Sequence, residues 1–288
     1  MMGIREKTIN FTCNYFKEEL HGLYDATEIE QSMFIVFLYY LKLNRVDLTI
    51  RKNDYINQLN FEKIKYVVED LKKYKPLAQI IGEWEFFGLA IKVNAYTLIP
   101  RPETEELVQL IINENKDREQ LSILDIGTGT GCIALVLKKN LPNAQVFAWD
   151  ISDEALTIAE QNATINSLQI VLKKEDILGI PKSNNQFDII VSNPPYITMN
   201  EKELMNKNVL DYEPHLALFV ENEEPLLFYN AIADFAWNNL NEKGKLYFEI
   251  NENFGQEVRR LLMDKNFKNI NIVKDINKKD RIVSCTIN

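Results

Sequence analysis

The chain has 288 residues, of which 46% are hydrophobic and 26% charged, an ordinary globular mixture that is too long for one small domain. Its formal net charge of -9 creates no general field that would attract a polyanion, which argues against sequence-independent binding to nucleic acid. We therefore expect a folded protein of two domains without direct contact to DNA or RNA.

Cysteine and histidine usage argues against disulfides and metal chemistry. The three cysteines, Cys13, Cys132 and Cys285, are far apart and form no C-x-x-C pair, and neither His21 nor His215 has a second candidate ligand beside it. No apolar stretch approaches the ~20 residues that span a bilayer, and the N-terminus has no apolar signal core. These features predict a cytoplasmic protein without a metal or a membrane segment, which we expect to be a monomer.

The first predicted domain, residues 1–75, contains few glycines or prolines and has apolar residues at helical spacing, such as Ile64, Val67, Val68 and Leu71. This pattern predicts a small helical bundle. Such a bundle is either a docking module for a partner or a stabilising cap, because a fold alone does not give a function.

Residues 76–100 have a different pattern, in which two short apolar runs flank Gly88. The first run begins at Trp84 and the second covers residues 89–93, as in two strands joined by a tight turn. We predict a β-hairpin linker here.

From Leu121 onward, strand-like runs alternate with helical stretches, and residues 101–288 are predicted to form a single α/β domain. The last two runs lie too close together for a crossover helix, so the final strand should be antiparallel in an otherwise parallel sheet. The seven predicted strands are Ile123–Ile126, Val146–Trp149, Ile170–Leu172, Phe187–Val191, Lys245–Ile250, Ile270–Val273 and Arg281–Ile287.

A glycine-rich turn follows the first of these strands. Alternate glycines between a strand and a helix permit positive φ and let a ligand lie against the backbone. Dinucleotide sites use G-x-G-x-x-G, but here the third glycine comes one residue early, and an acid before the turn suits a cationic amino acid moiety better than a diphosphate. The D-x-G-x-G-x-G pattern resembles the first motif of S-adenosylmethionine-dependent methyltransferases, whose cofactor contacts here would be Asp125, Gly127, Thr128, Gly129, Thr130 and Gly131.

Further acids end the next two strands. Asp150 lies about 20 residues beyond the glycine turn, where a carboxylate can accept hydrogen bonds from both ribose hydroxyls of an adenosine. Asp176 ends the third strand and could bind the adenine amino group, while Ile177 packs on the ring. Because ligands bind at the carboxyl ends of strands in open α/β sheets, we expect these residues to share one edge with the glycine turn.

The fourth strand leads into Asn193-Pro194-Pro195-Tyr196. Consecutive prolines fix φ and remove two backbone donors, so this segment is rigid and rich in acceptors. The Asn193 side-chain oxygen and the Pro194 carbonyl could each accept one N–H of a planar amide or amino group, with Tyr196 against its face. Holding both hydrogens would direct the nitrogen lone pair toward the sulfonium methyl, and we predict catalysis by positioning.

N-P-P-Y is shared by methyltransferases that act on amino groups of nucleic acid and by those that act on glutamine amides. Residues 79–86 (Gln-Ile-Ile-Gly-Glu-Trp-Glu-Phe) and 98–105 (Leu-Ile-Pro-Arg-Pro-Glu-Thr-Glu) closely resemble the linker and the I-P-R-P-x-T-E segment of the HemK-type peptide chain release factor glutamine methyltransferases. Further similarity lies at residues 212–218, 248–250 and 280–283. The chain departs from the family at Glu221-Asn222 and at Asn251, where glycines are usual.

This resemblance implies a Rossmann-like methyltransferase fold and methylation of the glutamine in the Gly-Gly-Gln loop of bacterial class I release factors, with S-adenosylmethionine as the methyl donor. It also implies that the helical domain helps to dock the factor. A glutamine methyltransferase of a ribosomal protein, an amino-methyltransferase acting on DNA or RNA, and a non-catalytic cofactor-binding scaffold are the alternatives.

Three charged residues of the I-P-R-P-x-T-E segment remain open to two interpretations. Arg101, Glu103 and Glu105 lead into the helix that would cover the cofactor. They could line the cofactor pocket or form a structural ion network.

Overall fold

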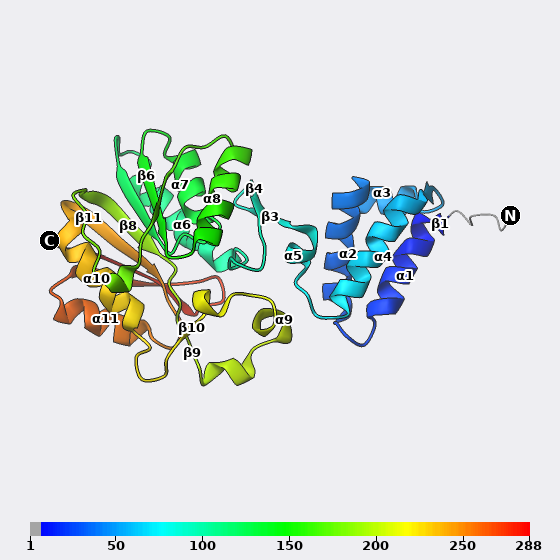
Figure 1. The fold of residues 1–288 in the computed structure, drawn as a ribbon. Coiled ribbons are helices and arrows are strands. Elements are labelled where there is room, and N and C mark those ends of the chain that lie inside the picture. The colour runs from blue at the N-terminus through cyan, green and yellow to red at the C-terminus, as the bar shows by residue number, and fades with distance from the viewer. Residues whose placement is uncertain (1–6) are drawn as a thin grey trace. The chain divides into compact units, whose positions relative to one another are not determined.

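The computed structural model describes residues 7–288, which divide into two units (Figure 1). The first unit takes in the described residues up to Gly82 together with Lys207–Tyr212, and the second comprises Glu83–Asn206 and Glu213–Asn288. The first unit is therefore built from two stretches of chain that are far apart in sequence.

The first unit is mainly helical, with one two-stranded antiparallel pair. Its elements are β1 (Lys7–Thr8), α1 (Ile9–Leu20), α2 (Ala26–Leu41), α3 (Arg45–Ile50), β2 (Tyr55–Ile56), α4 (Gln58–Leu71), α5 (Leu77–Ile81) and α9 (Lys207–Leu210). Polar side chains begin four of these helices by accepting hydrogen bonds from backbone N–H groups of the first turn, which would otherwise have no partner. These cap residues are Thr8, Asp25, Asn44 and Asn57.

The core of the helical unit is made by the apolar faces of α1, α2 and α4. Phe16, Phe37 and Ile64 are fully buried there, each on a different helix. The periodicity that predicted a bundle is thus the periodicity of the buried face.

The hairpin predicted around Gly88 forms between β3 (Glu83–Phe86) and β4 (Leu89–Lys92). Phe87 and Gly88 both adopt positive φ, as a two-residue hairpin turn requires. The side chain of Asn162 accepts a hydrogen bond from Lys92 N at 2.7 Å and donates one to Lys92 O at 3.1 Å, so the hairpin is held within the second unit.

The second unit is built on a seven-stranded sheet in the order β12-β13-β11-β8-β5-β6-β7. All neighbours are parallel except β13, which runs antiparallel to both β11 and β12, so the predicted seven-stranded, mostly parallel sheet is confirmed. The strands are β5 (Ser122–Ile126), β6 (Gln145–Asp150), β7 (Val171–Lys174), β8 (Phe187–Ser192), β11 (Leu240–Glu249), β12 (Lys268–Lys274) and β13 (Asp280–Thr286).

Helices cover both faces of this sheet, with α6, α7 and α8 on one side and α10 and α11 on the other (Figure 1). This arrangement explains why the central strands are apolar along their whole length, with Ile123, Leu124 and Ile190 fully buried. The helices are α6 (Pro102–Asn115), α7 (Cys132–Asn140), α8 (Asp153–Ile165), α10 (Leu227–Asn239) and α11 (Gly255–Asp264).

Short elements connect the larger ones at the carboxyl edge of the sheet. They are η1 (Ile177–Gly179), η2 (Glu201–Leu204), η3 (His215–Ala217) and the parallel pair β9 (Ile197–Thr198) and β10 (Phe219–Val220). In the central strands, Ile126 is paired with Ser192 on one side and with Trp149 on the other. The residues after these three strand ends therefore meet at one place.

Cys13, Cys132 and Cys285 are free thiols. Between residues 7 and 288, no helix has the length and apolar character needed to cross a bilayer.

Candidate active site

A cavity of about 340 Å³ lies at the carboxyl edge of the sheet, wholly within the second unit. It brings together residues from the turns after β5, β6, β7 and β8, and from the segment that leads into α6. The predicted site residues that line it are Arg101, Gly127, Thr128, Gly129, Thr130, Asp150, Asp176, Ile177, Asn193, Pro194 and Pro195.

The glycine turn presents open backbone to this cavity. Gly127 and Gly129 adopt φ values of +74° and +54°, and a Cβ atom at either position would meet no other atom within 4 Å. The Gly129 N–H donates to Asp150 Oδ2 at 2.8 Å, and Ser152 N donates to Asp150 Oδ1 at 3.0 Å. Burial raises the pKa of the Asp150 carboxyl, while these backbone donors oppose that change.

Asp125 and Gly131 belong to the same turn but do not line the cavity. Asp125 is fully buried, and its Oδ2 accepts a hydrogen bond from the Thr128 hydroxyl at 2.6 Å, whereas Oδ1 has no hydrogen-bond partner in residues 7–288. Burial raises the pKa of Asp125 to about 7, Thr128 counteracts this, and the nearby Asp150 charge adds to it. Gly131 instead starts α7 at a φ of +79°.

The turn after β7 supplies Asp176 and Ile177. Asp176 is exposed, and its Oδ1 accepts a hydrogen bond from Leu178 N at 2.9 Å, which caps η1. Ile177 is half-buried and packs against the core formed by the sheet and α10. Both line the cavity, so a carboxylate and an apolar surface stand next to each other on this wall.

The N-P-P-Y segment follows β8 and places its first three residues against the cavity. The Asn193 Nδ2 group donates to the Thr104 hydroxyl at 3.2 Å. Neither Asn193 Oδ1 nor the Pro194 carbonyl accepts a hydrogen bond from the described part of the chain. Two acceptors without partners therefore lie on one rigid segment.

Tyr196 does not line the cavity. Its ring packs against the core of the sheet, and its hydroxyl donates to Glu249 Oε1 at 3.2 Å. Burial raises the pKa of this phenol, and the charge of Glu249 raises it further. The hydroxyl is therefore a hydrogen-bond donor at neutral pH.

The three charged residues before α6 have different surroundings. Arg101 lines the cavity and also forms an ion pair with the buried Glu213, whose Oε2 accepts a hydrogen bond from Ile99 N at 3.1 Å. Glu105 accepts a hydrogen bond from Phe87 N in the hairpin turn at 2.6 Å, away from the cavity lining. Glu103 is half-buried and is not part of the lining either.

Much of the remaining wall comes from residues that sequence reasoning did not identify as part of the site. Thr97 lies on this wall with a buried hydroxyl oxygen that has no partner in the described chain, and it precedes the recognised I-P-R-P-x-T-E segment by only two residues. An apolar surface completes the wall, formed by Leu98, Pro214, Leu216, Ala217, Phe228 and Ile232. The resemblance to the family at residues 212–218 covers Pro214 and Ala217, but it did not indicate that either residue lines the cavity.

The positions at which the chain departs from the family pattern stabilise the loop after Tyr196. The Asn251 side chain donates to the Tyr196 carbonyl at 3.3 Å and to Glu201 Oε1 at 3.1 Å. Asn222 Oδ1 accepts a hydrogen bond from Asn200 N at 2.9 Å. The side chains of these asparagines thus form hydrogen bonds with the loop, which glycines could not form because they have no side chain.

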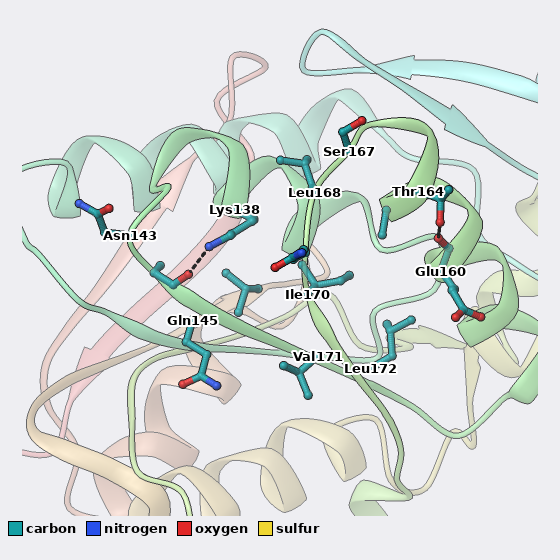
Figure 2. Close-up of a pocket in the computed structure, with 14 residues that line it drawn as sticks. Lys138, Asn143, Gln145, Glu160, Thr164, Ser167, Leu168, Ile170, Val171 and Leu172 are labelled. Carbon is teal, nitrogen blue, oxygen red and sulfur yellow. Dashed lines mark hydrogen bonds between the residues drawn. The ribbon is translucent and has the colours of Figure 1, made fainter.

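A second hollow, of about 950 Å³, lies along the first residues of β6, the end of α8 and the edge strand β7 (Figure 2). Lys138 donates to the carbonyls of Pro142 and Ala144 at 2.8 Å each, so its charge is already engaged there. Among the lining residues only Lys138 and Glu160 are charged, and none is a predicted site residue. Nor do residues 7–288 contain a cluster of His, Cys, Asp and Glu able to hold a metal ion.

Comparisons with known proteins agree with this geometry. The family described as Methyltransferase small domain matches residues 104–212, which cover the glycine turn and the N-P-P-Y segment. A methyltransferase from Pyrococcus furiosus shares the fold with a TM-score of 0.51 and 19% identity, over 80% of this chain and 99% of that one. The Rossmann-like methyltransferase fold expected from the sequence is confirmed.

Two relatives are similar over nearly the whole chain. The release factor glutamine methyltransferase of Flavobacterium psychrophilum is 48% identical over 93% of this chain and 95% of its own length. The protein of the same name from Bacteroides thetaiotaomicron is 41% identical over 94% of this chain and 97% of its own length. This similarity includes both units and every segment that lines the cavity, and the chain therefore belongs to the family of release factor glutamine methyltransferases.

Proposed function

We propose that this protein transfers a methyl group from S-adenosylmethionine to the side-chain amide nitrogen of a glutamine in a peptide chain release factor. The observation that carries the proposal is a cavity lined both by a methyltransferase glycine turn and by Asn193 and Pro194, whose Oδ1 and carbonyl oxygen accept no hydrogen bond from residues 7–288. The family to which the chain belongs supports the choice of a glutamine amide as the group held there.

The cavity suits a nucleoside that carries an amino acid. Its volume of about 340 Å³ is in the range of roughly 300–1,000 Å³ that is usual for small-molecule sites. The glycine turn leaves its backbone uncovered, and the buried Thr97 hydroxyl and Asp125 carboxyl each have an oxygen without a partner. Because buried polar atoms normally have partners, the Thr97 oxygen on the cavity wall favours a polar ligand there.

Each end of the cavity can bind a different part of the cofactor. We propose that Asp150 accepts hydrogen bonds from the ribose hydroxyls, that Asp176 accepts one from the adenine amino group, and that Ile177 packs on the ring. Asp125 would place negative charge behind the glycine turn, toward the ammonium group of the amino acid moiety. When bound, the cofactor supplies an electrophilic methyl group on a sulfonium ion.

The chain's own residues then provide positioning and electrostatic stabilisation. An amide nitrogen is a poor nucleophile because its lone pair is delocalised into the carbonyl group. Asn193 Oδ1 and the Pro194 carbonyl would each accept one N–H of the substrate amide, which favours localisation of the lone pair and aims it at the methyl group. The methylated nitrogen would be cationic and acidic, and it would lose one of its protons to solvent. The prolines keep both acceptors rigid, so little reorganisation is needed during the reaction.

The exposed surface of the helical unit supports a docking role for the predicted domain of residues 1–75. Several large apolar side chains are exposed there, among them Val46, Ile50, Tyr55 and Leu59. Apolar side chains that form a contiguous exposed patch are typical of protein–protein interaction sites. We propose that the release factor binds this unit and that the enzyme acts as a monomer in the cytoplasm, where its substrate functions.

The direct test is incubation of the purified protein with labelled S-adenosylmethionine and either a class I release factor or ribosomal proteins. We expect one methyl group on the glutamine of the Gly-Gly-Gln loop, located by peptide mass spectrometry. Label on a ribosomal protein but not on the factor would reject the proposed substrate. Label in oligonucleotides alone would reject glutamine as the acceptor.

Asn193→Ala should separate catalysis from cofactor binding. We expect kcat to fall by about 100-fold or more, as for the loss of one preorganised hydrogen-bonding group, while the Kd for S-adenosylmethionine stays within about threefold. Asn113→Ala, an exposed change of the same kind on α6, serves as the control. Equal losses in kcat and cofactor affinity would show that Asn193 serves the cofactor instead.

A further inference from the structure

A buried carboxylate lies behind the N-P-P-Y segment. Glu249 ends β11 and is 1% exposed, and Phe248 before it is paired with Ser192 of the neighbouring strand β8. Because Phe248 and Ser192 are paired, the next residues along the two strands, Glu249 and Asn193, lie beside each other. Thr104, in the first turn of α6, completes the group from a third element.

The hydrogen bonds of this group run in one direction. Thr104 donates its only hydroxyl hydrogen to Glu249 Oε2 at 2.6 Å, and the Tyr196 hydroxyl donates to Oε1 at 3.2 Å. The Thr104 oxygen can then only accept, and it accepts from Asn193 Nδ2 at 3.2 Å. The Thr104 hydroxyl, whose hydrogen is donated to Glu249, thus determines which end of the Asn193 amide faces Thr104.

This polarity fixes the orientation of the asparagine side chain. If the amide turned over, Asn193 Oδ1 would face the Thr104 oxygen, and two acceptors would lie together without a hydrogen between them. The Nδ2 group would then face the cavity, where it would repel the N–H groups of an incoming amide. In the structure, Nδ2 donates to Thr104, and Oδ1 of this cavity-lining residue has no partner in residues 7–288.

Stability alone gives a weak reason for placing a carboxyl group here. Burial raises the pKa of Glu249, and the Thr104 hydroxyl and the Arg281 charge only partly compensate. Buried ionisable groups add little net stability, because desolvation offsets their hydrogen bonds. A role in orienting neighbouring side chains accounts for the group better.

We propose that Thr104 and Glu249 are positioning residues that hold the Asn193 side-chain amide with its oxygen toward the substrate nitrogen. The inference rests on the proposed function, in which Asn193 Oδ1 accepts an N–H of the glutamine amide. Thr104 lines the cavity and Glu249 does not. In this proposal both act through Asn193 and, for Glu249, also through Tyr196.

The test compares Thr104→Val, which keeps the shape but removes the hydroxyl, with Thr104→Ser, which keeps the hydroxyl. We expect Thr104→Val to lower kcat by about 10- to 100-fold, while KM for the release factor and the Kd for S-adenosylmethionine stay within about threefold. Thr104→Ser should retain kcat within about threefold. Thr157→Val, the same chemical change at an exposed position of α8, is the matched control.

Glu249→Gln tests the carboxylate separately. A glutamine amide has only one acceptor end, so it cannot accept from both the Thr104 and the Tyr196 hydroxyls. Its NH₂ end would donate to one of them and reverse part of the network. We expect a loss of kcat similar to that of Thr104→Val, again without a matching rise in KM.

A double-mutant cycle shows whether Thr104 acts through Asn193. In the Asn193→Ala background, Thr104→Val should cause no further loss of kcat, because the side chain it orients is already absent. An additive loss would overturn the inference. So would wild-type kcat in Thr104→Val, or an equal loss in Thr104→Ser and Thr104→Val.

A readout without turnover keeps this inference distinct from the proposed function. The side-chain NH₂ protons of Asn193, assigned by their disappearance in Asn193→Asp, should exchange slowly in the unliganded wild type and in Thr104→Ser, but quickly in Thr104→Val. If the wild-type enzyme methylated no release factor, the proposed function would fail, while the exchange rates would still decide the orientation. Equal exchange in all three proteins would overturn the positioning role.

Discussion

At the scale of single residues, the fold strongly changes the ionisation of Asp125. The sequence placed it just before the glycine turn and predicted an ionised group near a cation. In the unliganded structure it is fully buried with one oxygen unpartnered, and burial raises its pKa to about 7. Burial without a counter-charge favours the protonated form of a carboxyl group, so Asp125 binds a proton more tightly than an exposed aspartate does.

This state of Asp125 predicts how stability changes with pH. Because the folded-state pKa of about 7 lies above the ordinary aspartate pKa of 3.8, the folded protein binds more protons than the unfolded chain between about pH 4 and pH 7. Stability from this group is therefore present below about pH 4 and is lost as the pH rises to 7. Asp125→Asn, which mimics the neutral form, should lack this loss.

Denaturant unfolding at pH 5 and pH 8 measures the effect. Relative to wild type, Asp125→Asn should gain roughly 2 kcal/mol of unfolding free energy between the two pH values. Asp176→Asn, an exposed carboxyl at the same edge of the sheet, is the control. The same relative stability of Asp125→Asn at both pH values would show that Asp125 is ionised in the folded protein.

At the scale of elements, the glycines of the turn between β5 and α7 have different tasks. Gly129 has a φ of +54° and open space where a Cβ would lie, facing the cavity. Gly131 has a φ of +79°, and a Cβ there would lie 3.1 Å from Ala159 Cβ on α8. The last glycine therefore serves the packing of α7 against α8, whereas Gly129 lets the backbone face the cavity.

Alanine substitutions should separate these tasks. Gly129→Ala should cost about 1 kcal/mol of unfolding free energy, because it carries only the penalty of a left-handed residue. Gly131→Ala should cost about 2–4 kcal/mol, because overpacking against Ala159 is added to the same penalty. Chemical denaturation of the unliganded proteins measures both. Equal costs would mean that α8 shifts freely to make room.

The Kd for S-adenosylmethionine should show the opposite order. Gly129→Ala places a methyl group on the cavity wall, so it should weaken cofactor binding more than Gly131→Ala does. Stronger weakening by Gly131→Ala would contradict the placement of Gly131 outside the cavity lining.

At the scale of the whole molecule, the chain returns to the helical unit after it has formed part of the second unit, and the sequence did not suggest this order. The segment after the N-P-P-Y loop enters the helical unit at Lys207–Tyr212 and leaves it at Glu213. The Tyr212 hydroxyl donates to the Lys73 carbonyl at 2.8 Å, and the Tyr212 carbonyl accepts from the Gln79 side chain at 2.9 Å. The helical unit thus anchors a segment that begins and ends close in sequence to cavity residues.

Tyr212→Phe tests this anchor. Loss of the hydroxyl removes one hydrogen bond and should lower the unfolding free energy of the helical unit by about 0.5–1.5 kcal/mol. Tyr66→Phe, at an exposed tyrosine of α4, should change it little. The measurement is denaturant unfolding followed by a probe within the helical unit. An effect no larger than that of Tyr66→Phe would show that the Tyr212 hydroxyl bond contributes nothing to this unit.

The sequence by itself determined the strands, the hairpin turn and the glycine and N-P-P-Y segments. Each of these is coded locally, by a period of two or 3.6 residues, by a glycine that permits positive φ, or by prolines that fix it. The short distance between the last two strand-like runs was enough to predict the antiparallel strand β13. Because parallel strands end on the same side of a sheet, the local pattern also predicted that most of the site residues lie at one edge of the sheet.

Only the tertiary structure decided which distant residues meet. Thr104, Asn193 and Glu249 come from three separate elements, and their network depends on β11 pairing with β8. The same holds for the anchoring of Tyr212 by Lys73 and Gln79. These contacts arise from strand order and packing, and a single sequence carries no periodic signal for pairs so far apart. Ionisation follows the same rule, because the burial that raises the pKa of Asp125 comes from the assembled fold and not from its neighbours in the chain.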